Sequence, residues 1–191
     1  MKHLIVVRHS VSQQEPGKSS HEWGLTDEGR ARLTLLAEQV EKYKLTHIYA
    51  GPEPKMELTG QGLAAALGVA CTTDNHLHET RRDTAPYFED VDQFREAIKA
   101  AIDEPHALLY GEETFDDAYE RVDTRIAELA SIHEGQSFGV VTGGTVIALF
   151  VNRKAGLDTY KVWRSLRMPC YAVFTLPDLA FVELVTAPFK R

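Results

Sequence analysis

The chain has 191 residues, of which 43% are hydrophobic and 26% are charged, and its formal net charge is −7. This length and composition suit one soluble globular domain with a full hydrophobic core. The acidic balance excludes a general nucleic-acid binder, which needs a large basic surface, but it allows a small phosphorylated ligand in a local basic pocket.

Neither a membrane span nor a leader sequence is expected. The longest apolar runs, at residues 4–7 and 146–151, fall far short of the roughly 20 residues that cross a bilayer. Residues 1–3 lead directly into a strand pattern without the layout of a signal peptide, so we expect a cytoplasmic protein without membrane contacts. Cys71 and Cys170 lie far apart without C-x-x-C spacing, and we expect two ordinary buried thiols.

The first half of the chain predicts strands that alternate with helices. His3–Val7 is a continuous apolar run, typical of a strand buried on both faces. Residues 8–20 are polar and predict a loop. Thr26 can cap a following helix that runs to about residue 44. The remaining elements expected here are a strand at 46–50, a helix at 54–67 that opens with a proline, and a short strand at 69–73.

The second half continues this alternation and ends in a hairpin. We expect helices at 87–102, 114–133 and 145–155, and strands at 137–142, 170–176 and 180–186. Together the elements predict a three-layer α/β/α sandwich with a mostly parallel central sheet. We expect a single domain over residues 1–191, with a lid-like insertion at about residues 81–111 above the carboxyl edge of the sheet.

Three loops at that edge, where such sheets bind ligands, carry residues suited to an anion. Arg8 offers a forked cation for phosphate oxygens, and a neutral His9 imidazole can attack phosphorus. Lys55 lies at the start of a helix, whose positive end favours an anion. Gly143 and Gly144 form a turn before another helix, where backbone donors can approach an anion closely. Taken singly, such residues are also typical of ion pairs, surface lysines and tight turns.

The loop at residues 76–82 (HLHETRR) holds two histidines, a glutamate and two arginines. Glu79 is a candidate general acid if the fold brings it near His9, and is otherwise typical of a solvated ion pair. His76 and His78 are weak candidates for metal ligands, because no second cluster has matching spacing. We expect neither a metal nor an organic cofactor.

The order of these pieces resembles the histidine phosphatase superfamily, the phosphoglycerate-mutase-like fold, over nearly the whole chain. The strand ending in Arg-His at residues 4–9 and the L-T-x-x-G helix start at 25–29 are its most specific elements. The strand–turn–helix at 48–67 resembles the family's segment with S-S-P and a second phosphate-binding arginine. Gly-Glu at 111–112 and Arg-Val at 121–122 resemble its G-E-S/T…R-V segment.

The resemblance implies roles for individual side chains. His9 would be the nucleophile that becomes phosphohistidine, Arg8 would clamp the phosphoryl oxygens, and Ser12 would contribute a hydroxyl group. Glu79, with Leu77 two residues before it, matches the family's L-x-E position. It would protonate the leaving alcohol and later activate water. The implied partner is a small phosphorylated molecule.

The chain departs from the family pattern at several positions. Lys55 stands at the second arginine and keeps the charge without the planar fork. Residues 50–52 read Ala-Gly-Pro in place of S-S-P, and Ser10 replaces a glycine.

The largest departure is Gly143, which occupies the position of the family's second histidine. Loss of one such donor typically costs about 10²–10³ in rate. The backbone of Gly143 and Gly144 could still cradle an anion, and His21 or His78 could reach the pocket from a loop.

Two hypotheses follow. The first is a phosphatase that hydrolyses a small phosphomonoester through a phosphohistidine at His9, and the short span of residues 80–110 favours it over a sugar-phosphate mutase. The alternative is a catalytically degenerate relative that binds a phosphorylated ligand or a protein partner without turnover. A nucleotide-binding module at residues 140–145 is disfavoured, because no glycine-rich phosphate-loop pattern accompanies it. The sequence carries no signal for an oligomeric state.

Overall fold

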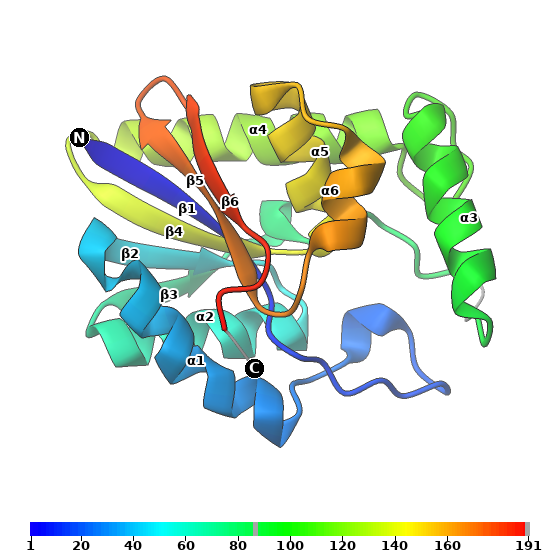
Figure 1. The fold of residues 1–191 in the computed structure, drawn as a ribbon, viewed down its shortest axis with the longest axis horizontal. Coiled ribbons are helices and arrows are strands. Elements are labelled where there is room, and N and C mark those ends of the chain that lie inside the picture. Colours follow the sequence, from blue (N-terminus) through cyan, green and yellow to red (C-terminus); the bar gives the residue numbers. More distant parts are fainter. Residues whose placement is uncertain (86–87, 190–191) are drawn as a thin grey trace.

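The computed structural model describes residues 1–85 and 88–189. Figure 1 shows a central sheet with helices on both faces. The elements are β1 (Lys2–Arg8), α1 (Asp27–Val40), β2 (Leu45–Ala50), α2 (Pro54–Leu67), β3 (Ala70–Thr73), α3 (Val91–Asp103), α4 (Phe115–Ile132), β4 (Ser137–Thr142), α5 (Gly144–Ala155), α6 (Thr159–Ser165), β5 (Cys170–Leu176) and β6 (Phe181–Val185). Short 3₁₀ turns lie at Ser20–Glu22, Glu41–Tyr43 and Asn75–Leu77.

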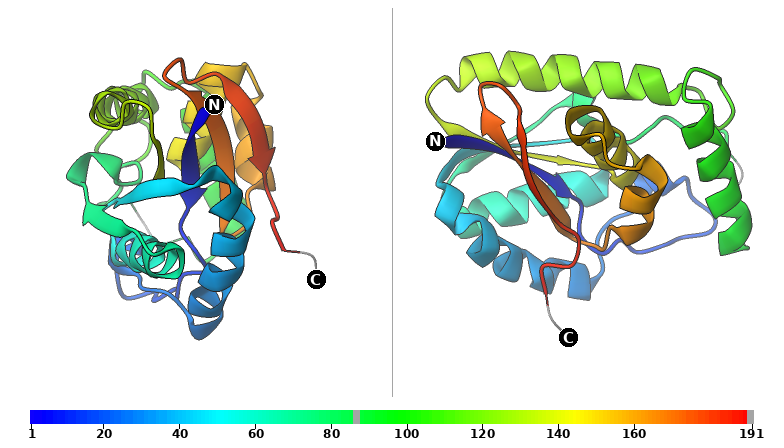
Figure 2. Two further views of the ribbon diagram at one scale, coloured as in Figure 1. Left: turned by 90° about the vertical axis from the view of Figure 1, so that its left-hand side faces the viewer. Right: turned by 45° about the horizontal axis from the view of Figure 1, so that its top comes forward.

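The sheet has the order β3-β2-β4-β1-β5-β6. Strands β3, β2, β4 and β1 run parallel, and β5 and β6 add an antiparallel hairpin at one side. Helices α1 and α2 cover one face, while α4, α5 and α6 cover the other (Figure 2). The predicted α/β/α sandwich with a mostly parallel sheet is confirmed.

The apolar run in β1 shows why this strand lies at the centre of the sheet. Leu4 and Val6 pack into the core under α4 and α5, whereas Ile5 and Val7 pack into the core above α1 and α2. All four side chains are fully buried. Because successive strand residues face opposite sides, a strand covered on both faces needs an unbroken apolar sequence.

Several predicted boundaries were wrong for local reasons. Helix α1 ends at Val40, four residues early, because a 3₁₀ turn follows and Lys44 takes a left-handed conformation with φ of 51°. Helix α3 begins at Val91, where the Asp90 side chain accepts a hydrogen bond from the backbone of Asp92. The first residue expected in that helix, Tyr87, lies outside the described residues.

Two further features differ from expectation. Helix α6 was not predicted, although Asp158 caps it by accepting a hydrogen bond from the backbone of Lys161 at 2.8 Å. Cys170 is buried in β5, but Cys71 is only partly buried because it lies on the edge strand β3.

The strand order brings the three candidate loops to one edge of the sheet. Strand β4 lies between β2 and β1, so their carboxyl ends are neighbours. The backbone N–H of His9 donates to Thr142 at 3.2 Å, and that of Gly51 donates to Val141 at 2.9 Å. Among the described residues, no helix is long and apolar enough to cross a membrane.

Candidate active site

His9 follows the last residue of β1 and is buried at the carboxyl edge. Its Nδ1 lies 2.9 Å from the carbonyl oxygen of Ser10. Because a carbonyl oxygen can only accept, Nδ1 carries the proton and Nε2 presents a lone pair. Burial, together with the charges of Lys55 and Arg8, lowers the pKa of His9 to about 3. The ring is therefore neutral at pH 7, as a nitrogen nucleophile must be.

The start of α1 fixes the loop that carries His9. Thr26 Oγ1 accepts a hydrogen bond from Gly29 N at 2.9 Å and donates to the carbonyl oxygen of Val11 at 3.2 Å. A Cβ at position 29 would lie 2.3 Å from that oxygen, so only glycine allows the approach. The hydroxyl of Ser10 also donates to the carbonyl oxygen of Gly29 at 2.8 Å. The L-T-x-x-G sequence therefore holds the His9 loop against α1.

The guanidinium group of Arg8, the last residue of β1, also lies at the carboxyl edge of the sheet. Its Nη1 donates to the carbonyl oxygen of Leu166 at 2.8 Å. Its Nε is buried and has no hydrogen-bond partner within residues 1–85 and 88–189. A Cβ at Gly144 would lie 2.9 Å from Nε, so the glycine leaves room for the guanidinium. Burial lowers the pKa of Arg8, against the opposing charge of Glu79. A buried donor without a partner is a candidate contact for a phosphate oxygen.

Lys55 lies in the first turn of α2, after Pro54, and its side chain is almost fully buried. Its Nζ lies 2.8 Å from Glu53 Oε2 and also donates to the carbonyl oxygen of Ser20. Burial lowers the pKa of Lys55, although the Glu53 carboxylate opposes the shift. This cation is therefore already paired inside the protein.

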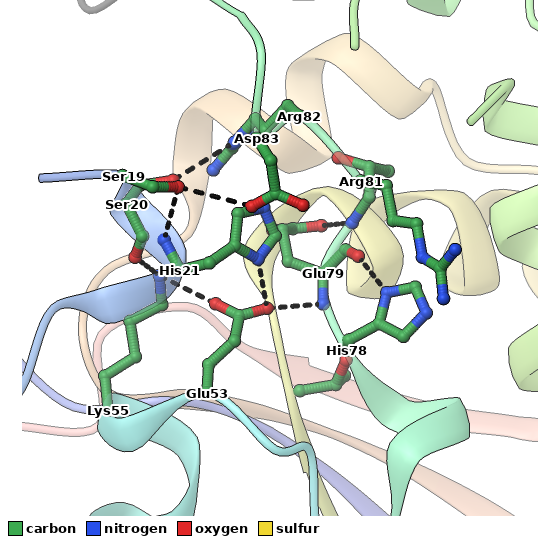
Figure 3. Close-up of polar contacts among 12 residues, drawn as sticks. Ser19, Ser20, His21, Glu53, Lys55, His78, Glu79, Arg81, Arg82 and Asp83 are labelled. Carbon is green, nitrogen blue, oxygen red and sulfur yellow. Dashed lines mark hydrogen bonds and ion pairs between the residues drawn. The ribbon is translucent and has the colours of Figure 1, made fainter. Parts of the chain in front are cut away.

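Glu53 is the site residue that the sequence analysis missed. Figure 3 shows its carboxylate between Lys55, His21 and the backbone of Glu79. His21 Nδ1 lies 3.1 Å from Oε1, and the Glu79 N–H donates to the same oxygen at 2.8 Å. Burial alone would raise the pKa of Glu53, but His21 and Lys55 outweigh it and lower the pKa. The sequence signal was its position immediately before the proline of a predicted helix.

The carboxylate of Glu79 lies at the N-terminal end of α5 and accepts hydrogen bonds from its first turn. Its Oε2 accepts a hydrogen bond from Thr145 N at 2.9 Å, and its Oε1 accepts from Val146 N at 3.2 Å and from Thr80 N at 2.9 Å. A carboxylate has about four lone-pair positions, so one remains for a substrate or a proton. The helix end that the sequence analysis assigned to an external anion thus holds the chain's own carboxylate.

Gly143 permits this arrangement by having no side chain. A Cβ at position 143 would lie 2.2 Å from Oε2 of Glu79 and 2.8 Å from its Cβ. The space beside Gly143, where the resemblance implies a second histidine, is therefore filled by the side chain of Glu79.

The other candidate residues are not brought together in the same way. Ser12 forms a β-bridge with Leu25, and its hydroxyl group makes no hydrogen bond with any of the described residues. The side chain of His78 points away from Glu53, and its Nδ1 lies 2.6 Å from the carbonyl oxygen of Glu79 (Figure 3). His21, in contrast, contacts the carboxylate of Glu53. Within the described part of the chain, no group of three or more His, Cys, Asp or Glu residues is placed to hold a metal ion.

The α/β/α sandwich and the Arg8-His9 pair at the end of β1 agree with the class of protein that the sequence resemblance indicated. Residues 4–176 match the family model of the histidine phosphatase superfamily (branch 1). The chain belongs to this superfamily, as its resemblance in sequence indicated.

Similar proteins are phosphatases and hydrolases. Phosphoserine phosphatase 1 of Hydrogenobacter thermophilus is 25% identical over 170 residues, which cover 85% of this chain and 81% of that protein. The solved structure of mycobacterial hydrolase 1 superposes with a TM-score of 0.76 at 17% identity, covering 93% of this chain and 92% of that one. The α-ribazole phosphatase of Shigella flexneri gives 0.73 at 17% identity, covering 97% and 96%. At these identities the structural matches show the shared fold.

Proposed function

We propose that this protein hydrolyses small phosphomonoesters through a covalent phosphohistidine at His9. The observation that carries the proposal is the state of His9: a buried neutral ring whose Nδ1–H is fixed on a backbone carbonyl, so that Nε2 is the free nucleophile. The phosphatase relatives support the same reaction type. We extend the proposal to the segment at 81–111, which would cover the bound substrate as a lid.

In the first step, the Nε2 lone pair forms a bond to phosphorus while the bond from phosphorus to the alcohol oxygen breaks. Arg8 would donate to the phosphoryl oxygens through Nε, and Lys55 would add positive charge nearby. Glu79, protonated at its remaining oxygen position, would give its proton to the departing alcohol.

In the second step, water attacks the phosphohistidine and the P–N bond breaks, which restores the His9 lone pair. Glu79 would take the proton from the attacking water and so return to its starting state. Inorganic phosphate leaves. The cycle uses side chains alone and returns His9 and Glu79 to their starting states.

The alternative is a relative that binds a phosphorylated ligand or a protein partner without turnover. It is favoured by the charge balance, because Glu53 pairs Lys55 and Glu79 faces Arg8. Position 143 also offers no second histidine donor.

The deciding experiment measures phosphate release from 4-nitrophenyl phosphate by wild-type protein and by His9→Ala. Removal of a nucleophile is expected to lower turnover by about 10⁴-fold or more. The matched control is His76→Ala, an exposed histidine that should keep wild-type turnover. Quenching during turnover with an alkaline denaturant should trap one phosphate, stable in base and labile in acid, on the peptide containing His9, detected by mass spectrometry. An active His9→Ala protein would refute the proposal, and phosphate binding without turnover by wild type would favour the alternative.

A further inference from the structure

A cavity of about 290 Å³ lies near the Glu53–Lys55 ion pair, between the loop at 14–23 and the segment at 82–110. Its walls include four aromatic side chains and one arginine, namely Trp23, Phe88, Phe94, Tyr110 and Arg82. The proposed mechanism uses none of these residues.

Three of the aromatic rings form a compact wall. The ring centroid of Phe94 lies 6.1 Å from that of Phe88 and 6.3 Å from that of Tyr110, and the remaining pair is 6.0 Å apart. The guanidinium carbon of Arg82 lies 5.7 Å from the Phe94 centroid. The rings are tilted by 37° to 62° relative to one another, and these contacts restrict them into a largely apolar wall.

Ser20 connects the wall of the cavity to Lys55, a residue of the proposed phosphate site. Ser20 lines the cavity, and its carbonyl oxygen accepts a hydrogen bond from Lys55. The hydroxyl of Ser20 lies 3.5 Å from Nε of Arg82 (Figure 3). The ring of Trp23, another wall residue, lies 5.8 Å from Lys55 Nζ. The cavity wall thus combines aromatic rings with Arg82, and Lys55 lies directly behind Ser20 and Trp23 of that wall.

Arg82 is held in place by the segment that follows α3. The Glu112 carboxylate accepts hydrogen bonds from Asp83 N and Thr84 N, each at 2.8 Å. Gly111 has φ of +90°, and a Cβ there would lie 2.7 Å from the Cα of Arg82. This close approach requires glycine and fixes the position of Arg82 before any ligand arrives.

We propose that the cavity binds the alcohol group of the substrate and selects phosphomonoesters whose alcohol carries an aromatic ring or a similarly bulky apolar group. This inference rests on the proposed function. The phosphate would lie against His9 and Arg8, and the ring would pack against Phe94 and Tyr110. Burial of a ring-sized apolar group should favour such a substrate by about 10- to 100-fold over one without it.

The test compares 2-phenylethyl phosphate with ethyl phosphate, whose leaving alcohols are of the same primary alkyl type. Wild-type kcat/KM should be about 10- to 100-fold higher for the phenylethyl ester. In parallel, calorimetry measures the binding of 2-phenylethylphosphonate and ethylphosphonate, which cannot be hydrolysed. The phenylethyl compound should bind tighter by a similar factor.

Substitution of the aromatic wall should remove the preference. Phe94→Ala, together with Phe94→Leu as a variant that keeps more of the packing, should lower the phenylethyl-to-ethyl ratio at least fivefold for alanine and less for leucine. Leu108→Ala, an exposed residue of the same segment, is the matched control and should leave the ratio unchanged.

The outcomes separate the two proposals. Equal binding of the two phosphonates by wild type would overturn the cavity inference even if hydrolysis were fast. A preference for phosphoserine or glycerol phosphate over the phenylethyl ester would overturn it as well. Selective phosphonate binding without hydrolysis of any ester would support the cavity inference while refuting the proposed function.

Discussion

The two halves of the candidate active site are built in opposite ways. Around His9, backbone and hydroxyl groups from neighbouring elements fix one neutral ring, and the supporting bonds are uncharged. Around Glu53, Lys55 and Glu79, the supporting contacts involve buried charged groups: Lys55 forms an ion pair with Glu53, and the Glu79 backbone donates to the Glu53 carboxylate. The nucleophile half is therefore set by local chain geometry, whereas the charged half depends on residues from separate segments that must all be present.

This difference bears on phosphate binding. The two cations nearest His9, Arg8 and Lys55, are accompanied by two carboxylates, Glu53 and Glu79. With Glu79 protonated, as the proposed first step requires, one net positive charge remains to attract a phosphate dianion, and the buried Arg8 Nε offers a donor for it. We expect the charged half to be the more sensitive to substitution of a single carboxylate.

After loss of the nucleophile itself, the largest effect should come from Glu79→Gln, which keeps the shape of the side chain but cannot transfer a proton. The kcat/KM for ethyl phosphate, which reports the first transfer step, should fall by about 10³-fold, while kcat/KM for 4-nitrophenyl phosphate should fall less than about tenfold, because its leaving group needs no proton. Steady-state phosphate release measures both. The exposed Glu120→Gln serves as control. Equal losses on the two substrates would mean that Glu79 is not the proton donor.

Glu53→Gln should destabilise the fold by about 4 kcal/mol, because it leaves Lys55 buried without its counter-charge. Urea unfolding of this variant and of the exposed control Glu38→Gln measures the difference. Adding Lys55→Met to Glu53→Gln should restore part of the loss, since no buried charge then remains unpaired. A double variant less stable than the single one would contradict this account of the pair.

Gly143→Ala should cost about 3 kcal/mol in the free energy of unfolding, since the new methyl group would displace the Glu79 carboxylate from α5. Gly17→Ala, where a Cβ meets open space, should be close to neutral. In a Glu79→Ala background the cost at position 143 should shrink by about 1 kcal/mol. An unchanged cost there would show that the two positions do not compete for the same space.

The contrast between the halves also explains what the sequence could predict. Leu4–Val7, Arg8-His9 and the L-T-x-x-G helix start are contiguous patterns whose partners lie one element away, so their placement followed from periodicity and capping. In contrast, the contact of Glu53 with the backbone of Glu79 joins residues 26 positions apart, and that of Arg82 with Ser20 joins residues 62 positions apart. No local pattern reports such contacts, which arise only when the sheet order brings the loops together.

The smallest predicted effect concerns the pH dependence of stability in the neutral half. His9 has a pKa of about 3 in the folded protein, whereas an unfolded histidine has a pKa of about 6.5. Below pH 6.5 the unfolded chain binds a proton that the folded protein does not, so stability is complete above that pH and falls as the pH is lowered toward 3.

Between pH 7 and pH 5 this group alone should remove about 2 kcal/mol from the free energy of unfolding. Urea titrations of wild type and His9→Asn at both pH values isolate it, because the other titrating groups are common to both proteins. Wild type should lose about 2 kcal/mol more than the variant. Equal losses would mean that His9 is protonated in the folded protein near neutral pH, and the nucleophile would then have to be sought in another residue.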